Sequence, residues 1–348
     1  MSGPAQLDGI IVRATTGLYQ VQTDEGRLAC RLRGNLKKDL EFTTSGSRAK
    51  KVVQAKKKST TDPLAIGDRV TVELLRGEAA LALTGREEGT ECDGEGIIIE
   101  ARPRRNEVAR QRRVIGAVIG EGRHVLVANI EQLVIVFAVA EPNPSPWKLD
   151  RFLVVAEAAG MDAIIVANKI DLVEVVEVDQ AFDPFERLGY RVLRTSAESG
   201  IGVEALRAAL RGRISSFCGP SGVGKSSLLN ALYPGLSRHV SEIGEVTWKG
   251  RHGTTSAELI PIDANAHWRE TGWVADTPGL RKVELWQTPP ALIADCFIEF
   301  RPFLSECRFH DCTHLHEPGC AVKAAVMRGE VDQRRYEGFS ILCGEAQA

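Results

Sequence analysis

The chain carries the run Gly219-Pro220-Ser221-Gly222-Val223-Gly224-Lys225-Ser226-Ser227, which matches the pattern G-x-x-x-x-G-K-[ST]. Residues 213–218 before it read as a short buried strand, and residues 226–232 after it carry leucines at helical spacing. A glycine-rich turn between a strand and a helix points backbone N–H groups into one concavity, where the helix N-terminus adds partial positive charge. The run therefore predicts a phosphate-binding loop in which Lys225 reaches the β- and γ-phosphates and Ser226 offers its hydroxyl to Mg²⁺.

The residues before this run alternate between predicted strands and helices. The apolar stretch 131–139 is typical of a parallel strand that is buried on both faces. We expect a helix at 146–160, strands at 162–167 and 190–193, and helices at 180–188 and 203–210. This alternation predicts a doubly wound α/β domain.

Two motifs follow strands of this predicted sheet, namely Asn168-Lys169-Ile170-Asp171 and Ser196-Ala197. Ligands collect at the carboxyl ends of parallel strands. The carboxylate of Asp171 can accept hydrogen bonds from N1–H and the 2-amino group of guanine, and adenine lacks both donors. Asn168 would support the base edge and the loop, Lys169 would pack its stem over the ring, and the amide of Ala197 would meet guanine O6. These residues predict GTP rather than ATP, which disfavours an ATP-dependent kinase.

A third motif predicts the magnesium side of the nucleotide. Asp276 and Gly279 form D-x-x-G after the predicted strand at 273–275, so Asp276 is expected to bind Mg²⁺ mainly through water and the Gly279 amide to meet the γ-phosphate. The polar stretch 249–256 lies between the two phosphate elements. Either Thr254 or Thr255 could supply a second hydroxyl to Mg²⁺, and our prediction is Thr255.

Residues 8–85 show a different pattern of apolar and polar residues. Short apolar stretches predict strands at 9–12, 19–21, 28–32, 68–74 and 79–83, which favours a small β-barrel of the OB type. A basic segment interrupts them and contains Arg31, Arg33, Lys37, Lys38, Arg48, Lys50, Lys51, Lys56, Lys57 and Lys58. Loops of such barrels contact oligonucleotides, so the segment favours RNA, although a merely solubilising surface loop has the same composition.

Three of the eight cysteines cluster near the C-terminus, in the pattern Cys307-x4-Cys312-x-His314-x5-Cys320. Three thiolates and one imidazole match a closed, tetrahedral Cys₃His zinc site. His310 and His316 are rival ligands that the spacing leaves open. In a reducing compartment such a cluster favours a metal over disulfides.

The whole-chain properties set limits on function. A length of 348 residues indicates two or three domains, and a formal net charge of -2 gives no global case for nucleic-acid binding. The start lacks the apolar core of a secretory signal, and the longest apolar run, 133–140, is far shorter than the about 20 residues that span a bilayer. We expect a cytoplasmic protein that does not enter the membrane.

The order of the motifs is unusual. A conventional GTPase runs from the phosphate loop through the switch threonine and D-x-x-G to N-K-x-D and the Ser-Ala element, whereas here the last two come first. This order indicates a circularly permuted GTPase domain. With a barrel in front and a cysteine cluster behind, nearly the whole chain resembles the circularly permuted ribosome-assembly GTPases of the RsgA (YjeQ) family.

The glycines, proline and arginines of residues 86–112 indicate a linker. With the resemblance, this gives an OB-type barrel at 1–85, a circularly permuted P-loop GTPase domain at 113–284 and an α-helical zinc-binding domain at 285–348. The resemblance implies a GTPase that binds the rRNA of the small ribosomal subunit, is stimulated by that subunit and acts in its late maturation. Its cofactors would be Mg²⁺ with GTP and one structural zinc ion. We expect a monomer.

The residue after Gly279 bears on the mechanism. It is Leu280, where Ras-like GTPases place a glutamine that orients water, and a leucine cannot do this. The resemblance points to His252 as the catalytic group in its place, although an ordinary exposed loop histidine is the alternative. Gly253 stands where some relatives have threonine, which leaves the alignment of this segment open. A GTP-dependent RNA-binding scaffold with negligible turnover is the alternative function.

Overall fold

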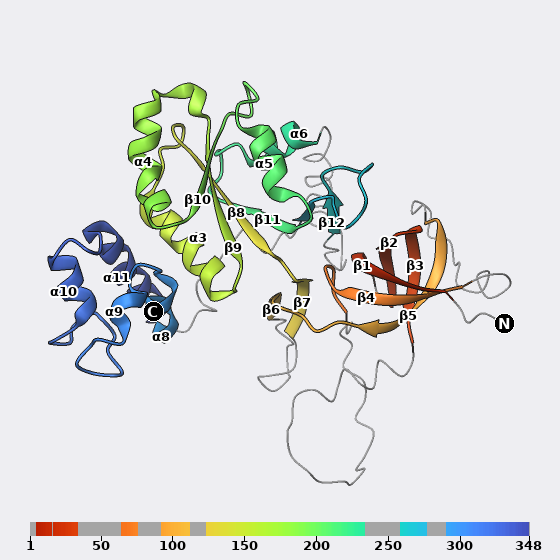
Figure 1. Cartoon of the computed structure of the whole chain (residues 1–348), viewed down its shortest axis with the longest axis horizontal. Coiled ribbons are helices and arrows are strands. Elements are labelled where there is room, and N and C mark those ends of the chain that lie inside the picture. The colour runs from red at the N-terminus through yellow and green to blue at the C-terminus, as the bar shows by residue number, and fades with distance from the viewer. Residues whose placement is uncertain are drawn as a thin grey trace, which may run out of the picture. The chain divides into compact units, whose positions relative to one another are not determined.

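The structure is a computed structural model that describes residues 5–15, 17–33, 64–75, 92–111, 123–233, 258–276 and 290–347. The chain divides into two compact units. One comprises residues 1–130 and 243–277, and the other comprises residues 131–242 and 278–348. Figure 1 shows the helices and strands of both units.

The first unit contains the predicted barrel. Its strands are β1 (Gln6–Thr15), β2 (Leu18–Thr23), β3 (Gly26–Leu32), β4 (Arg69–Leu74) and β5 (Gly94–Ala101). They pair in the order β1-β2-β3-β5-β4, and β4 also pairs with β1, which closes the barrel. Alternate side chains such as Val70 and Val72 point into an interior that Tyr19, Val21 and Ile98 also fill. The predicted OB-type barrel is confirmed.

The fifth strand of this barrel is β5, which lies inside the stretch 86–112 that the sequence assigns to a linker. It pairs in parallel with β3 and antiparallel with β4, and Ile98 is fully buried. The glycines and charged residues of this stretch are typical of a linker, but hydrogen bonding to β3 and β4 holds it in a strand. The strand expected at 79–83 and most of the basic segment lie outside the described residues. The domain boundaries stay predictions.

Two hairpins complete the first unit. One joins β6 (Glu107–Gln111) to β7 (Arg123–Ala128). The other joins β12 (Glu258–Pro261) to β13 (Trp273–Asp276), with Glu258 opposite Asp276. β12 also pairs with barrel strand β1, where Arg13 is opposite Glu258. The strand that ends in the D-x-x-G aspartate is therefore one strand away from the barrel.

The second unit contains a parallel sheet with the strand order β10-β9-β8-β11. Its strands are β8 (Gln132–Ala138), β9 (Asp162–Asn168), β10 (Arg191–Thr195) and β11 (Ile214–Cys218). Every residue of β8 is buried, as expected of a strand covered on both faces. The predicted α/β alternation is confirmed.

The helices of this sheet are α3 (Pro146–Ala158), α4 (Val175–Arg187), α5 (Val203–Leu210) and α6 (Lys225–Leu232), and η1 (Ile170–Leu172) is a short 3₁₀ turn. α3 packs on β8 and β9, α4 packs on β10, and α5 packs against α6. Within the described part of the chain, no helix has the length and apolar character that a membrane span requires.

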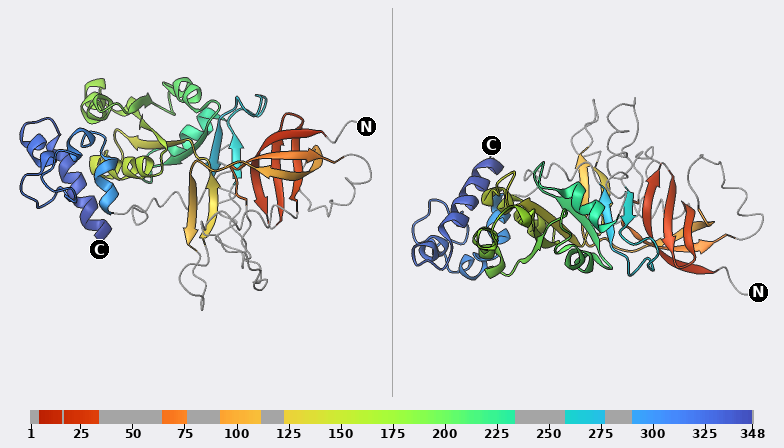
Figure 2. Two further views of the ribbon diagram at one scale, coloured as in Figure 1. Left: turned by 60° about the horizontal axis from the view of Figure 1, so that its bottom comes forward. Right: turned by 90° about the horizontal axis from the view of Figure 1, so that it is seen from above.

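The C-terminal residues form a set of helices beside α3 (Figure 2). They are α8 (Pro290–Ile293), η3 (Ala294–Cys296), α9 (Arg301–Leu304), α10 (Ala321–Met327) and α11 (Gln333–Gln347). Phe297, Phe300 and Phe339 form their core, with ring centroids 5.0 to 5.6 Å apart. The α-helical character expected of this C-terminal region is confirmed.

A buried ion cluster joins these helices to α3. Arg335 of α11 is 2% exposed and pairs with both Asp150 of α3 and Glu299. Arg334 also contacts Asp150, at 3.2 Å between Nη1 and Oδ2. The positive and negative charges balance, which is what permits their burial.

Candidate guanine-nucleotide site and metal centre

The phosphate loop (residues 219–224) runs from β11 to α6, as the sequence predicts. Gly219 has φ +135°, and a Cβ placed there would lie 2.1 Å from the carbonyl oxygen of Val136. Gly224 has φ +91°, and a Cβ placed there would lie 2.4 Å from Nδ2 of Asn168. Only glycine fits either position, so these two residues let the loop turn tightly against β8 and β9.

The first turn of α6 presents polar groups to this loop. Lys225 is the first helical residue, and its Nζ donates to the carbonyl oxygens of Gly219 and Pro220. Ser226 and Ser227 are exposed, as are Ser221 and Gly222. Val223 is only 1% exposed and anchors the loop in the core. The ammonium group thus lies within the loop, and the serine hydroxyls remain accessible to a ligand.

Asn168 connects the guanine motif to the phosphate loop. It is fully buried at the end of β9. Its Nδ2 donates to the carbonyl oxygen of Val223 at 2.9 Å, and its Oδ1 accepts from Thr195 Oγ1 at 3.1 Å. The side chain therefore ties three neighbouring structures together, namely β9, the end of β10 and the phosphate loop.

The residues after Asn168 turn sharply outward. Lys169 has φ +64°, a left-handed conformation that non-glycine residues rarely adopt and that is found preferentially at functional sites. Its Nζ donates to the carbonyl oxygen of Glu141, in the loop between β8 and α3. Asp171 lies in η1 and is exposed, as a carboxylate that receives a base must be.

The Ser-Ala element follows the neighbouring strand β10. Ser196 is fully buried, and its Oγ accepts from the backbone N–H of Ser199 at 3.1 Å. Ala197 is partly exposed in the same turn. Because β9 and β10 are parallel, with Asn168 opposite Thr195, both motifs lie at one edge of the sheet. That edge is the one from which the phosphate loop starts.

The magnesium side is described only in part. Asp276 ends β13, and nothing beyond its backbone is described. His252, Thr255, Gly279 and Leu280 lie outside the described residues, so their assigned roles stay predictions.

The cysteine cluster comes together as a compact set of ligand atoms. The sulfur atoms of Cys307, Cys312 and Cys320 and a ring nitrogen of His314 lie within 4.8 Å of one another. His314 Nδ1 is 3.4 Å from Cys307 Sγ and 3.5 Å from Cys320 Sγ, and the two sulfurs are 4.0 Å apart. A tetrahedral zinc ion with ordinary bond lengths requires about 3.6 Å between nitrogen and sulfur and about 3.8 Å between sulfurs. The cluster fits zinc.

Two pKa shifts in the cluster bear on how it would bind a metal. Burial lowers the pKa of His314, which keeps its imidazole neutral and able to bind a metal. Burial also raises the pKa of Cys312 to about 12, so a cation must displace the thiol protons. Backbone N–H groups of Ala321 and Lys323 point at Cys307 Sγ and Cys320 Sγ, where they would stabilise thiolates. His310 is 98% exposed and His316 is also exposed, so the geometry favours His314 among the three histidines.

Three residues at these sites are not found by sequence reasoning. Thr195 orients Asn168, the carbonyl of Glu141 receives Lys169, and Glu317 accepts from both the N–H and the hydroxyl of Thr313 between two cysteine ligands. These bonds lower the pKa of Glu317 to about 2, the Thr313 hydroxyl having the largest effect. Thr195 and Glu317 lie next to or within a motif, which is a signal that the sequence offers, whereas Glu141 is distant in sequence from every motif.

The sheet, the phosphate loop and the guanine motif define a P-loop GTPase whose motifs are circularly permuted. The chain matches the RsgA GTPase family over residues 101–286 and the RsgA N-terminal domain over residues 8–81. It therefore belongs to the RsgA family of GTPases, and it is a GTP-hydrolysing enzyme.

Relatives match along nearly the whole chain. A protein of Gemmatimonas aurantiaca named small ribosomal subunit biogenesis GTPase RsgA is 41% identical over 338 residues, which is 97% of this chain and 96% of the relative. A protein of the same name from Caldanaerobacter subterraneus is 33% identical and covers 98% of this chain and 96% of the relative.

Two solved structures share the fold. YjeQ from Thermotoga maritima has a TM-score of 0.69 and 30% identity, with 99% of each chain covered. YloQ, described as a circularly permuted GTPase, has a TM-score of 0.65 and 26% identity, with 99% of this chain and 96% of YloQ covered. The permuted order predicted from the motifs is thus confirmed.

Proposed function

We propose that this chain hydrolyses GTP to GDP and phosphate in the late maturation of the small ribosomal subunit, whose rRNA it binds. The hydrogen bond between Asn168 and Val223 is the observation that best supports GTP as the substrate, because it fixes a guanine-specifying motif against a phosphate loop. The relatives named small ribosomal subunit biogenesis GTPase support the ribosomal part.

The nucleotide would bind along the edge of the parallel sheet. Asp171 selects guanine through its N1–H and 2-amino groups, Lys169 covers the ring, and the Ala197 amide meets O6. Backbone N–H groups of residues 221–227 and the Nζ of Lys225 hold the phosphates. Because Asn168 contacts both regions, base recognition and phosphate binding depend on one buried side chain.

Ser226, Thr255 and Asp276 are the residues that would hold Mg²⁺. When bound, Mg²⁺ neutralises the negative charge that develops on the phosphates. The Ser226 hydroxyl is exposed next to the phosphate loop, which suits this role. His252 is our proposal for the group that assists hydrolysis, since Leu280 cannot orient water.

The cluster of Cys307, Cys312, His314 and Cys320 would hold one structural zinc ion. The ion would keep the loop between α9 and α10 in place, where the described residues offer only short helices. The barrel and this zinc region would contact rRNA. We further propose that the protein acts as a monomer in the cytoplasm, and that GTP favours the docked state while hydrolysis releases it.

The release step is tested by measuring the affinity of the protein for small ribosomal subunits with a non-hydrolysable GTP analogue and with GDP. The proposal predicts an affinity at least about tenfold higher with the analogue. The Lys225→Ala variant, which should lose phosphate binding, is the control and should not respond to either nucleotide. Equal affinities for the wild-type protein in the two states would contradict release by hydrolysis.

A further inference from the structure

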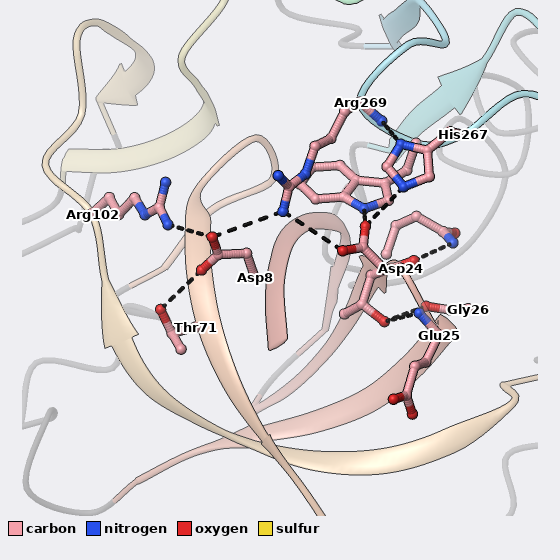
Figure 3. A network of polar contacts seen from close by, with 11 residues as sticks. Asp8, Asp24, Glu25, Gly26, Thr71, Arg102, His267 and Arg269 are labelled. Atoms are coloured by element: carbon pink, nitrogen blue, oxygen red, sulfur yellow. Dashed lines mark hydrogen bonds and ion pairs between the residues drawn. The ribbon is translucent and has the colours of Figure 1, made fainter. Parts of the chain in front are cut away.

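Three residues of the loop between β12 and β13 contact one aspartate of the barrel. Asp24 lies in the turn between β2 and β3, and its carboxylate faces the run His267-Trp268-Arg269 (Figure 3). Trp268 Nε1 donates to Asp24 Oδ1 at 2.5 Å, and His267 Nε2 lies 2.9 Å from the same oxygen. Arg269 Nη2 is 3.8 Å from Asp24 Oδ2. Three consecutive residues of the loop thus converge on one carboxylate.

Further contacts support this attachment. The Arg269 guanidinium lies over the Trp268 ring at 4.8 Å and reaches Asp8 of β1 at 3.8 Å. Asp8 in turn pairs with Arg102 at 2.7 Å. The hydrogen bond from Trp268, followed by the positive charge of Arg269 and the contact with His267, lowers the pKa of Asp24. The carboxylate is therefore charged at neutral pH, which these donors require.

Hydrogen bonds also connect the loop to itself and to β13. Trp273 Nε1 donates to the carbonyl oxygen of Trp268 at 2.9 Å, and Trp273 is only 4% exposed. The hydroxyl of Thr271 bonds to both the N–H and the C=O of Asp263, across the loop. A displacement of Trp268 would therefore be passed to Trp273, the first residue of β13. Asp276 is the last residue of this four-residue strand.

The hairpin is thus attached to the barrel at two places. At one end, β12 pairs with β1 through Glu258, the residue opposite Asp276. At the other end, Asp24 holds the loop. A hairpin attached at one place could swing, whereas attachment at both ends makes it move with the barrel.

We propose that Asp24 is a positioning residue for GTP hydrolysis, which fixes the β12–β13 hairpin to the barrel so that the barrel and Asp276 move together. The inference rests on the proposed role of Asp276 at Mg²⁺. It assigns the coupling between the barrel and the D-x-x-G motif to a contact between a barrel turn and the hairpin loop, outside the D-x-x-G motif itself. Asp24 acts through the hairpin and touches no substrate.

Substitution of Asp24 should leave the barrel folded. Its side chain is 49% exposed, and the barrel core is built from other residues such as Tyr19 and Val21. Asp24→Ala removes the acceptor, and Asp24→Asn keeps an acceptor for Trp268 but loses the attraction to Arg269. Glu25→Gln is the matched control, because it removes a charge from an exposed side chain of the same turn.

The first test is amide hydrogen exchange with Mg²⁺ and either a non-hydrolysable GTP analogue or GDP. In the wild-type protein the analogue should slow exchange at residues 24–26 and at 263–272, by at least about threefold relative to GDP. In Asp24→Ala the response at 24–26 should vanish, while Glu25→Gln should behave like the wild type. The inference would be overturned if exchange at residues 24–26 did not differ between the two nucleotides in the wild type, or if it still differed in Asp24→Ala.

The second test is the rate of GTP hydrolysis as a function of Mg²⁺ concentration. Asp24→Ala should raise the half-saturating Mg²⁺ concentration by about fivefold or more, as expected for loss of a charge-assisted hydrogen bond, and leave the KM for GTP within about twofold. Asp24→Asn should be intermediate. If Asp24→Ala had the same Mg²⁺ dependence as the wild type, Asp24 would have only a structural role and the inference would be wrong. Absence of hydrolysis in the wild type would instead contradict the proposed function, and the exchange experiment would still decide the coupling.

Discussion

At the scale of single residues, the nucleotide site depends on contacts between motifs that are far apart in the sequence. The types and spacing of Lys225, Asp171 and Asn168 follow from the chemistry of phosphate and guanine, so they could be predicted. The bond from Asn168 to the Val223 carbonyl could not, because it depends on the parallel pairing that places β9 near the phosphate loop. Sequence indicates which residues recognise a ligand and leaves open which residues orient them.

Asp171→Asn should weaken GTP and GDP binding without weakening ATP binding. The amide presents a donor where guanine also donates, so at least one charge-assisted bond is lost and affinity should fall about 10- to 100-fold. Titration of the three nucleotides measures this. Inosine triphosphate, which lacks the 2-amino group, should bind the wild type more weakly than GTP does. An unchanged preference for GTP in the variant would refute the assignment of the base site.

At the scale of elements, the sequence correctly predicts strands that are uninterrupted apolar runs. It does not predict strands that form only because neighbouring strands pair with them. Strand β8 is apolar throughout and buried on both faces, so its pattern identifies it. Strand β5 contains two glycines and two glutamates, and it is a strand because β3 and β4 flank it. A local pattern cannot contain that information. The same holds for the loop 262–272, whose attachment to Asp24 joins residues over 240 positions apart.

Arg335→Met should destabilise the association of the C-terminal helices with α3. Arg335 is buried between Asp150 and Glu299, and its removal leaves two buried carboxylates with less compensation. Such a loss costs about 3–5 kcal/mol. Arg328→Met is the control, since Arg328 is exposed and pairs only at the surface with Glu330, and it should change stability by less than about 0.5 kcal/mol. Urea unfolding measures the free energy of unfolding of both variants. Equal losses in the two would contradict the conclusion that the buried ion cluster stabilises the C-terminal helices against α3.

Removal of zinc should expose a specific set of thiols. After treatment with a chelator at pH 7.5, Cys307, Cys312 and Cys320 should become alkylated within minutes. Cys30, Cys296 and Cys343 are at most 4% exposed, so their thiols should stay inaccessible to the reagent until the protein unfolds. Mass spectrometry of the labelled peptides distinguishes the sets. If the chelator changes no labelling, the cluster does not hold a metal.

At the scale of the whole molecule, the permutation determines which parts adjoin the nucleotide motifs. The D-x-x-G aspartate ends a hairpin that pairs with the barrel, and the segment after it leads to the C-terminal helices. The guanine motif and the phosphate loop belong to the other compact unit. The proposed switch thus lies in the chain between the two regions proposed to bind rRNA. The order of the motifs was sufficient to predict this plan, since a permutation changes connectivity and leaves each motif intact.

In the proposed function, this GTPase acts on the small ribosomal subunit. The most direct test is the rate of GTP hydrolysis by the purified protein alone, with small subunits and with large subunits. Because Leu280 cannot orient water, the protein by itself should hydrolyse GTP slowly. Adding small subunits should raise this rate by about tenfold or more, and adding large subunits should not. Equal rates under all three conditions would contradict the ribosomal role and would leave a GTPase whose RNA partner is elsewhere.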